Sequence, residues 1–435
     1  MLTAHIAELI KNKSVLILGF GREGRSTYRL IKKAEGFTDL AISDLNPVTD
    51  VEEKVFCGAD YQKAIADFDI VFKSPGVVLE NLEFREKITS QTDEVINCFK
   101  ENIIGITGTK GKSTTTSLIY HILKECGKNP VLMGNIGIPA FEAAENENGE
   151  RPFVYELSCH QLEFAKKSPH TGVLLNIYPE HLDHYGTFEK YAHAKENMYR
   201  NMTDKDFLVC GYEFMPDSFK GECVSVSMAE KEAEYFVTVD SIFEKGALVK
   251  DNIKSNIFGV HNMYNTAVAY AVCKKYGVGR EEFFEALGNY NPLPHRLEKF
   301  LEHNGVRYFD DSISTIPETT IKALTSVENV GTVVLGGMDR NIELDALIEY
   351  LLKNPVKNVV LLPDTGKIIY EKLKDSYKYT LYMADNLDAA AKICTEVTKP
   401  GEACVLSPAA ASYGFFKNFE ERGDYFKKCI RECLK

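Results

Sequence analysis

The chain has 435 residues, and its 44% hydrophobic and 26% charged content is ordinary for a globular protein. Its length predicts about two to four domains, and its formal net charge of −12 argues against nucleic acid or an anionic membrane as the main partner. No apolar run approaches the ~20 residues that a membrane helix requires, and no signal sequence is recognisable. The 11 cysteines show no paired metal spacing, so we expect reduced thiols and a cytoplasmic protein.

The first predicted unit opens at residues 14–33, SVLILGFGREGRSTYRLIKK, with a short apolar strand, a glycine-rich turn and a helical pattern. Further strands are predicted at residues 39–44 and 69–76. The turn GFGREG, residues 19–24, matches the dinucleotide-binding fingerprint, and Asp44 follows about 20 residues later. The motif alone is compatible with a nicotinamide-dependent oxidoreductase. The phosphate loop described next favours instead a Rossmann-like domain that holds the phosphates of a nucleotide-linked substrate.

A second unit restarts at residues 102–127, NIIGITGTKGKSTTTSLIYHILKECG. An apolar strand leads into a glycine-rich loop at residues 108–111, where backbone N–H groups and a helix N-terminus can surround phosphate oxygens. Lys112 would reach the outer phosphates of ATP, and the Ser113 hydroxyl would bind Mg²⁺. The alternative is a plain strand–turn–helix with a serine cap. The residues expected to surround ATP here are Gly108, Thr109, Gly111, Lys112, Ser113 and Thr114.

Two candidate metal ligands follow strands of this second unit. Glu156 closes the strand FVYEL, and His181 follows the strand GVLLNI. Because the carboxyl ends of strands in an open α/β sheet surround the ligand crevice, both side chains should face the phosphate loop. Together with the Ser113 hydroxyl they could hold Mg²⁺, although this ion prefers oxygen ligands. The spacing HLDH, residues 181–184, could indicate zinc, but no matching cysteine or histidine set accompanies it, and we reject zinc.

Lys195 interrupts an apolar helix face. A helix from Phe188 onward would place Phe188, Tyr191 and Met198 on one stripe, and Lys195 falls within that stripe. Burial lowers the pKa of a lysine, and a neutral amine can add CO₂ to form a carbamate. Lys195 would then be a modified metal ligand. Periodicity alone favours a simpler interpretation, in which the stem packs and the ammonium reaches water.

A third unit restarts near residue 304, with predicted strands in NGVRYFDDS, GTVVLGGMD, NVVLLP and EACVLSP. Strands alternate with helices of about 10–15 residues, which predicts the α/β fold class with doubly wound parallel sheets. We predict three domains at residues 1–97, 98–292 and 293–435. The segment DDS, residues 310–312, could cap a helix after its strand, and GGMDR, residues 336–340, could be an ordinary turn.

Ordered blocks along essentially the whole chain resemble the Mur ligase family. They include SPGV, GITGTKGKSTTTS, GNIGIP, YELSCHQLE, NIYPEHLDHYGTFEKYAHAK, GVHNMYNTAVAYAV, LPHRLE, DDSISTIPETT, GGMDR and LSPAAASYGFFKNFEERGDYF. The resemblance implies a Rossmann-like N-terminal domain that binds the UDP part of a substrate and a central P-loop domain that binds ATP. It also implies a Rossmann-like C-terminal domain for the amino acid and nucleotide.

The resemblance further implies a two-step ligase reaction. ATP would phosphorylate the carboxylate of UDP-N-acetylmuramoyl-L-alanine to an acyl phosphate, and the amine of D-glutamate would then attack it to form an amide. Such a reaction serves the cytoplasmic synthesis of peptidoglycan precursors, and hence the cell wall, cell shape and cell division. The implied cofactors are ATP, Mg²⁺ (two ions expected) and a CO₂-derived carbamate on Lys195. The expected protein is a monomer without nucleic-acid or membrane partners.

Matching motif positions carry the family's residue roles onto this chain. The catalytic set would be Lys112, His181, Lys195 and His295, and the metal ligands would be Ser113, Glu156, His181 and Lys195. Beyond the phosphate loop, ATP would contact Asn262, Asn265, Arg296 and Asp311. The UDP-linked substrate would contact Gly21, Arg22, Glu23, Asp44, Ser74 and Asn135, and the incoming glutamate would contact Arg340, Ser412 and Phe419.

Several positions depart from the family pattern. Ile313 stands where a lysine is usual in the block DDSIST, and Gly414 stands where an aspartate is usual. Glu180 stands where aspartate is common, and Cys159 and His160 replace a serine–phenylalanine pair. The missing lysine leaves a ligase for L-glutamate as the nearest alternative. A folate polyglutamate ligase is a further alternative, and the N-terminal Rossmann-like unit argues against it. A non-enzymatic nucleotide-binding module is another, and the metal-binding set argues against that one.

Overall fold

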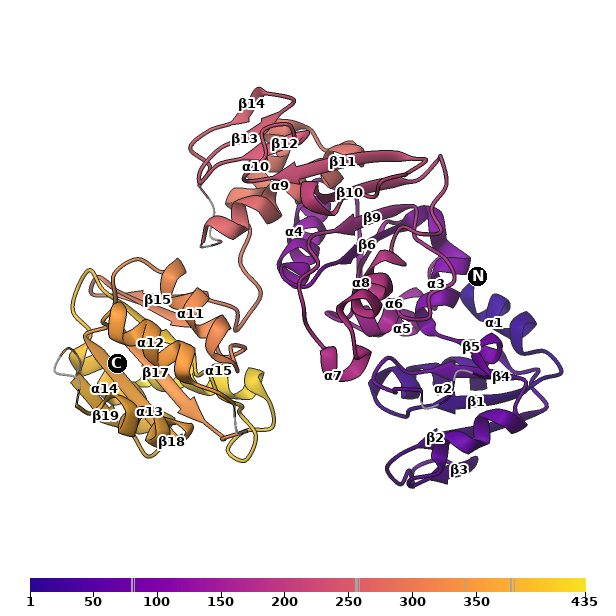
Figure 1. The fold of residues 1–435 in the computed structure, drawn as a ribbon, viewed down its shortest axis with the longest axis horizontal. Helices are drawn as coiled ribbons and strands as arrows, with labels where there is room; N and C mark the ends of the chain where they lie inside the picture. The colour runs from indigo at the N-terminus through magenta and orange to yellow at the C-terminus, as the bar shows by residue number, and fades with distance from the viewer. Residues whose placement is uncertain are drawn as a thin grey trace. The chain divides into compact units, whose positions relative to one another are not determined.

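The computed structural model describes residues 1–79, 81, 83–254, 257, 259–340, 342–375, 378 and 380–435. Within these residues the strands form three sheets accompanied by helices, which confirms the predicted α/β class (Figure 1). Contacts divide the chain into two compact units, of which the first contains Met1–Lys254 and His261–Tyr290 and the second contains Asn291–Lys435. The domain boundaries near residues 98 and 293 remain predictions. No helix in the described part of the chain is long and apolar enough to cross a membrane.

The first sheet is parallel, with the strand order β3-β2-β1-β4-β5. Its strands are β1 (Ser14–Leu18), β2 (Asp39–Asp44), β3 (Lys54–Cys57), β4 (Ile70–Lys73) and β5 (Ile88–Thr89), and its helices are α1 (Leu2–Ile10), α2 (Arg22–Ala34) and α3 (Gln91–Phe99). The central strand β1 is buried from Val15 to Leu18, as expected for a parallel strand with both faces covered. The turn GFGREG therefore lies at the carboxyl edge of this sheet.

The second sheet has the order β14-β13-β12-β11-β10-β9-β6-β8-β7, parallel from β7 to β12 and antiparallel beyond β12. Its strands are β6 (Ile103–Thr107), β7 (Val131–Gly134), β8 (Phe153–Glu156), β9 (Thr171–Leu174), β10 (Phe207–Gly211), β11 (Glu222–Ser227), β12 (Tyr235–Val237), β13 (Ile242–Glu244) and β14 (Ala247–Lys250). The helices are α4 (Lys112–Glu125), α5 (Ala140–Ala144), α6 (Cys159–Leu162), α7 (Leu182–Tyr185), α8 (Phe188–Glu196), α9 (Val260–Lys275) and α10 (Arg280–Gly288). Because β6 lies between β8 and β9, the loops that follow these strands open at one edge of the sheet.

The first and second sheets share one apolar core within the first unit. Buried side chains from α1, β1 and α3 pack in the same cluster as those from β6, α5 and β8. At the polar edge of this core, the buried Gln91 side chain accepts from the Phe141 N–H at 3.1 Å and donates to the Glu23 carbonyl at 2.9 Å. The shared core explains why contacts group the two sheets into one unit.

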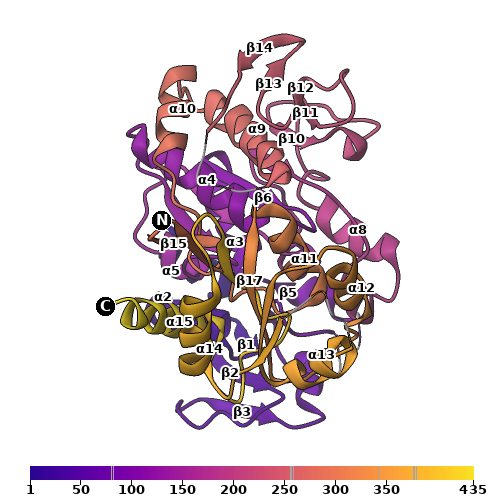
Figure 2. The ribbon, with the colours of Figure 1, turned by 90° about the vertical axis from the view of Figure 1, so that its left-hand side faces the viewer.

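The third sheet has the order β15-β16-β20-β17-β18-β19, and only the β15–β16 pair is antiparallel among its described strands. Its strands are β15 (Glu298–His303), β16 (Val306–Asp310), β17 (Val330–Gly337), β18 (Asn358–Asp364), β19 (Thr380–Met383) and β20 (Ala403–Leu406). The helices α14 (Leu387–Val397) and α15 (Phe419–Cys433) cover one face of this sheet, whereas α11 (Pro317–Ser326), α12 (Asp345–Lys353) and α13 (Thr365–Leu373) cover the other (Figure 2).

Candidate active site

The glycine-rich loop between β6 and α4 has the predicted strand–loop–helix form. Gly108 and Gly111 both have positive φ, at 157° and 89°. A Cβ atom at Gly108 would lie 2.8 Å from Cβ of Leu175, and one at Gly111 would lie 2.8 Å from Oδ1 of Asn265. Glycine is therefore required at both positions. The free N–H groups of the first turn of α4 provide an anion-binding end.

The chain that follows β9 holds this loop in shape. The Asn176 side chain accepts from the Lys110 N–H at 2.8 Å and donates to the Lys110 carbonyl at 3.0 Å. The Thr109 hydroxyl accepts from the Tyr178 N–H at 2.9 Å and lies 2.8 Å from the Tyr191 hydroxyl. These protein contacts thus fix the shape of the phosphate loop. Sequence reasoning missed Asn176, whose partner lies 66 positions away.

Two lysines converge on one carbonyl oxygen of the loop. Lys112 Nζ donates to the Gly108 and Thr109 carbonyls at 3.0 and 3.1 Å, and Lys195 Nζ donates to the same Gly108 oxygen at 2.7 Å. Burial lowers the pKa of both amines, and with the added repulsion of Lys112 it brings the pKa of Lys195 to about 7. Lys195 is only 1% exposed, so the interpretation in which its ammonium reaches water is wrong.

The helix that carries Lys195 confirms the predicted stripe in part. α8 begins at Phe188, as predicted, and the Thr187 side chain caps it by accepting from the Lys190 N–H. Tyr191 is fully buried, whereas Phe188 at the edge of the stripe is 37% exposed. The amine of Lys195 is therefore delivered to the phosphate loop by an ordinary amphipathic helix.

Glu156, at the end of β8, presents a buried oxygen that lacks a protein partner. Its Oε1 accepts from Asn135 Nδ2 at 2.8 Å, but its buried Oε2 has no hydrogen-bond partner among the described residues. Lys112 is close enough for Glu156 to act on its pKa. A buried anionic oxygen of this kind suits a cation, and with the Ser113 hydroxyl it forms an oxygen donor set that fits Mg²⁺.

His181 follows β9 in a loop tied to the phosphate loop. It precedes α7 with φ 55°, and its side chain is 47% exposed. Burial lowers its pKa, which favours the neutral imidazole that a metal requires. Glu180 pairs with Lys110 at 2.5 Å, which links this loop to the phosphate loop. The ring of His160 lies 5.0 Å from that of His181, a neighbour that sequence reasoning did not identify.

The turn GFGREG lines a cavity of about 390 Å³ at the edge of the first sheet. All but one of the residues predicted for the UDP-linked substrate line it, namely Gly21, Arg22, Glu23, Asp44 and Ser74. Asn135 is the exception, because its side chain binds Glu156 instead. Arg22 nevertheless donates to the Gly137 carbonyl at 2.5 Å, so the cavity adjoins the loop that carries Asn135.

Several of these cavity residues also build the turn itself. Asp44 accepts from the Phe20 N–H at 2.6 Å, and Ser74 donates to the Gly19 carbonyl at 2.7 Å. Glu23 accepts from Gln161 Nε2 at 2.8 Å, and burial raises its pKa. These three side chains are therefore engaged by protein groups, and their contact with a substrate remains a prediction.

Helix α9 brings the predicted adenine-side residues next to the phosphate loop. Asn262 and Asn265 are buried, and Asn265 Nδ2 donates to Asn262 Oδ1 at 2.9 Å. Asn265 Oδ1 is the atom that excludes a side chain at Gly111. The two amides thus adjoin the loop that would hold ATP, while their contact with adenine remains a prediction.

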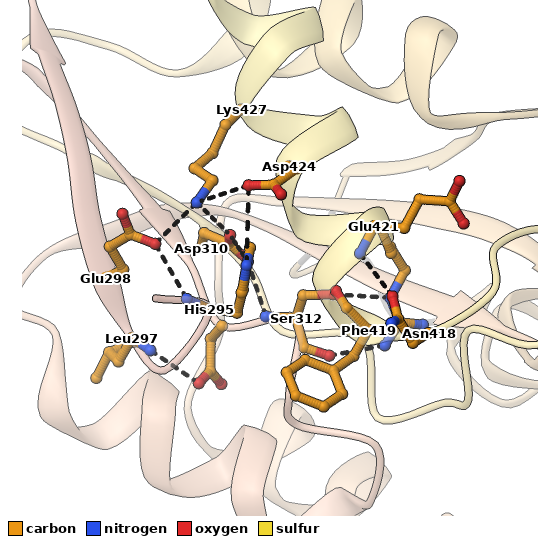
Figure 3. Close-up of polar contacts among 12 residues, drawn as sticks. His295, Leu297, Glu298, Asp310, Ser312, Asn418, Phe419, Glu421, Asp424 and Lys427 are labelled. Carbon is orange, nitrogen blue, oxygen red and sulfur yellow. Dashed lines mark hydrogen bonds and ion pairs between the residues drawn. The ribbon is translucent and has the colours of Figure 1, made fainter. Parts of the chain in front are cut away.

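In the second unit, His295 and Asp311 are engaged by neighbouring protein groups, and Figure 3 shows His295 beside Asp310. His295 Nδ1 lies 2.7 Å from Asp310 Oδ2, and Asp311 accepts from the Leu297 N–H at 3.0 Å and from the Ser407 hydroxyl at 2.7 Å. Burial raises the pKa of Asp311 to about 6. The interpretation of DDS as a helix cap is wrong, because the next helix, α11, begins only at Pro317.

The segments that carry the predicted glutamate-binding residues also adjoin one another within the second unit. The Met338 N–H donates to the Ala411 carbonyl at 3.1 Å, which joins the segment of Arg340 to that of Ser412. Phe419 begins α15, and its carbonyl accepts from the Ser312 hydroxyl at 2.8 Å.

Arg422, which sequence reasoning missed, holds these segments together. Its fully buried guanidinium donates to the Ser312 hydroxyl, the Ser312 carbonyl and the Ala410 carbonyl at 2.8–3.0 Å. Burial lowers its pKa to about 10, so it remains charged at neutral pH.

Comparison with known proteins adds an independent line of argument. Residues 106–273 match the model of the Mur ligase middle domain. The chain is 33% identical to the UDP-N-acetylmuramoylalanine--D-glutamate ligase of Geobacillus kaustophilus (strain HTA426), covering 97% of this chain and 98% of that protein. It is also 33% identical to the protein of the same name from Streptococcus agalactiae serotype Ia, with 96% of each chain covered.

Solved structures show the same fold. The chain is similar to UDP-N-acetylmuramate-alanine ligase from Thermotoga maritima, with a TM-score of 0.63, 22% identity, and coverage of 97% of this chain and 99% of that one. It is also similar to the MurF ligase of Thermotoga maritima in complex with ADP, with a TM-score of 0.62, 16% identity, and coverage of 98% and 96%. At these identities the likeness concerns the fold alone.

Proposed function

The chain belongs to the Mur ligase family, and we propose that it joins D-glutamate to UDP-N-acetylmuramoyl-L-alanine at the expense of ATP. The enzyme is an ATP-dependent amide ligase of peptidoglycan synthesis. In the first step the substrate carboxylate attacks the terminal phosphorus of ATP, giving an acyl phosphate and ADP. In the second step the glutamate amine attacks the acyl carbon, and an amide forms as phosphate leaves and the amine loses a proton.

The first step requires two anions to meet, so the enzyme must neutralise negative charge as it develops. Lys112 and the backbone N–H groups of residues 108–114 would bind the ATP phosphates. Lys112 now donates to two loop carbonyls, and it would exchange them for phosphate oxygens when ATP binds. The contacts of Asn176 keep the loop in shape before ATP arrives, which lowers the free energy that ordering would cost.

Glu156, Ser113 and His181 would hold Mg²⁺ beside this loop, and Lys195 would join them after addition of CO₂. When bound, the metal supplies charge neutralisation and polarises phosphoryl and acyl oxygens. The buried unpartnered oxygen of Glu156 supports this assignment. For Lys195, a pKa of about 7 supports carbamate formation, because only the neutral amine can attack CO₂ and release a proton as the carbamate forms.

The cavity beside GFGREG is suited to the UDP part of the acid substrate, since Arg22 offers a cation there. In the second unit, Arg340, Ser412 and Phe419 would bind the incoming glutamate. Asn262 and Asn265 would contact the adenine side of ATP. Also in the second unit, Arg296 would contact a phosphate, Asp311 the ribose, and His295 would act beside them.

The observation that carries the proposal is the convergence of three groups at one edge of the second sheet. The phosphate loop, the unpartnered carboxylate oxygen of Glu156 and the buried amine of Lys195 all meet there. A nicotinamide oxidoreductase would leave this set without a use.

The test is phosphate release from ATP with UDP-N-acetylmuramoyl-L-alanine and D-glutamate, L-glutamate or no amino acid. We expect sustained release with D-glutamate alone. Lys112→Met should abolish it, whereas Lys124→Met, which changes an exposed lysine on the same helix, should not. Release only with L-glutamate would mean that L-glutamate, and not D-glutamate, is the substrate. This alternative arises because Ile313 and Gly414 depart from the family pattern. Binding of NAD without phosphate release would reject the ligase.

A further inference from the structure

A strained turn precedes β15 in the second unit and carries Arg296 at its centre. His295 and Leu297, on either side, have φ values of 63° and 47°, in the left-handed region that non-glycine residues avoid. The Nε atom of Arg296 is buried and has no hydrogen-bond partner within the described residues. A turn with this strain persists only where surrounding contacts hold it.

Carboxylates provide several of those contacts. The His295 N–H donates to Glu298 Oε2 at 3.0 Å, and the Leu297 N–H donates to Asp311 Oδ1 at 3.0 Å. The His295 ring lies 2.7 Å from Asp310 Oδ2, and because a carboxylate only accepts, Nδ1 carries the proton. The turn that carries Arg296 is therefore held in part by acidic side chains, of which Glu298 and Asp310 are drawn in Figure 3.

These acidic groups lie close enough together to repel one another. His295, Glu298 and Asp310 each offer an atom within 4.8 Å of the others, a grouping that could otherwise hold a metal ion. Instead, Lys427 Nζ lies 3.0 Å from Glu298 Oε2, 3.2 Å from Asp424 Oδ1 and 3.6 Å from Asp310 Oδ2. In Figure 3 Lys427 and Asp424 reach this cluster from α15. The Lys427 ammonium therefore supplies positive charge among these carboxylates.

The packing of α15 brings the ammonium to this point. A Cβ atom on Gly423 would lie 2.2 Å from His295 Nδ1 and 2.5 Å from Asp310 Oδ2, so glycine lets the helix contact the pair directly. Lys427 is one turn further on the same face of the helix, and its side chain is only 10% exposed. Burial acts to lower the pKa of Lys427, but its bond to Glu298 and the attraction of Asp310 raise that pKa above its usual value.

We propose that Lys427 is a positioning residue that serves as a built-in cation for the carboxylates that hold the turn of Arg296. By neutralising Glu298 and Asp310 it keeps the turn at residues 295–297 in its strained form and so fixes the backbone position of Arg296, the residue that the proposed function assigns to a phosphate of ATP. The inference rests on the proposed function, because that function assigns the phosphate to Arg296. Without the ammonium, the crowded carboxylates separate and the turn relaxes.

The first experiment measures the rate of phosphate release as a function of ATP concentration in three variants. Lys427→Met keeps the stem without the charge, and we expect its KM for ATP to rise roughly 10- to 100-fold with little change in kcat. Lys427→Arg should restore most of the affinity. Lys428→Met, which changes the exposed neighbour, should match the wild type. A wild-type KM for ATP in Lys427→Met would overturn the proposal.

The second experiment needs no ligase activity, so it separates failure of this inference from failure of the proposed function. Lys427→Ala leaves the carboxylates of Glu298 and Asp310 around a vacant position, and added Zn²⁺ should raise its Tm more than that of the wild type. The double variant Lys427→Ala/Glu298→Gln should lose this extra rise. Equal rises in Tm on addition of Zn²⁺ to the wild type and to Lys427→Ala would contradict the proposal that Lys427 acts as a built-in cation. If Lys427→Ala does not fold, Lys427→Met and Lys427→Arg are compared by Tm, and equal values would have the same meaning.

Discussion

Replacing Lys195 by methionine should stabilise the ligand-free protein while removing its ligase activity. The amine is 1% exposed, and its pKa falls from 10.5 to about 7 in the folded chain. At 1.36 kcal/mol per pKa unit, holding the charged form costs the folded protein up to about 5 kcal/mol. Loss of the hydrogen bond to Gly108 reduces this gain in stability by about 1–3 kcal/mol. The methionine side chain fills much the same volume as the aliphatic part of the lysine. We expect a net gain of about 2–4 kcal/mol at pH 7 or below.

The size of this effect changes with pH in a defined window. Between pH 7 and 10.5 the unfolded chain binds the proton of Lys195 and the folded chain does not, so wild-type stability rises with pH. Below about pH 7 both states bind the proton and the full penalty applies. The advantage of Lys195→Met should therefore shrink steadily as the pH rises from about 7 toward 10.5.

Urea unfolding in CO₂-free buffer without nucleotide or metal measures this difference, since carbamate formation is then suppressed. Lys190→Met, which changes an exposed lysine on the same helix, is the matched control and should change stability by less than about 0.5 kcal/mol. Phosphate release is measured on the same preparations in bicarbonate. A Lys195→Met variant that is less stable than the wild type, or an advantage independent of pH, would refute the reasoning.

Three further outcomes follow from the site and the fold. Lys195→Ala should lose activity that added short carboxylic acids partly restore, and full activity in the simple variant would remove Lys195 from the mechanism. Glu156→Gln should lower kcat roughly 100-fold or more and weaken the Mg²⁺ dependence of ATP binding, measured by calorimetry, because a neutral amide is a poor metal ligand. Gly24→Ala should lower the free energy of unfolding by about 1–3 kcal/mol in urea, since its Cβ would lie 2.1 Å from the Gly19 carbonyl oxygen; unchanged stability would contradict the close approach.

Much of the fold could be predicted because its signals are local. The strand, loop and helix of residues 103–125 follow from a short apolar run, two glycines and a lysine at the first helical position. The face of α8 that carries Lys195 follows from spacing alone. The position of Glu156 follows from the rule that parallel strands end at a common edge.

Contacts between distant segments could not be predicted from the sequence. Asn176 and Lys110 lie 66 positions apart, and their pairing depends on how β9 lies beside β6. Whether the amine of Lys195 is solvated or buried also depends on the Gly108 carbonyl, to which it donates. The spacing of residues along one helix cannot reveal this distant partner. Asp310 and Asp311 suggested a helix cap, but the fold gives them distant partners, the ring of His295 for Asp310 and the hydroxyl of Ser407 for Asp311.

The apolar core common to the first two sheets limits how this enzyme can be divided. A cut near residue 98 would separate the side chains of α3 and β1 from Phe141 and Tyr155, and each fragment would expose a large apolar surface to water. Residues 1–97 are therefore a poor choice as an isolated fragment for testing the binding of uridine nucleotides. They are equally unsuited to domain exchange between related enzymes. A recombinant piece that ends near Tyr290 keeps that core whole and is the better starting point for such work.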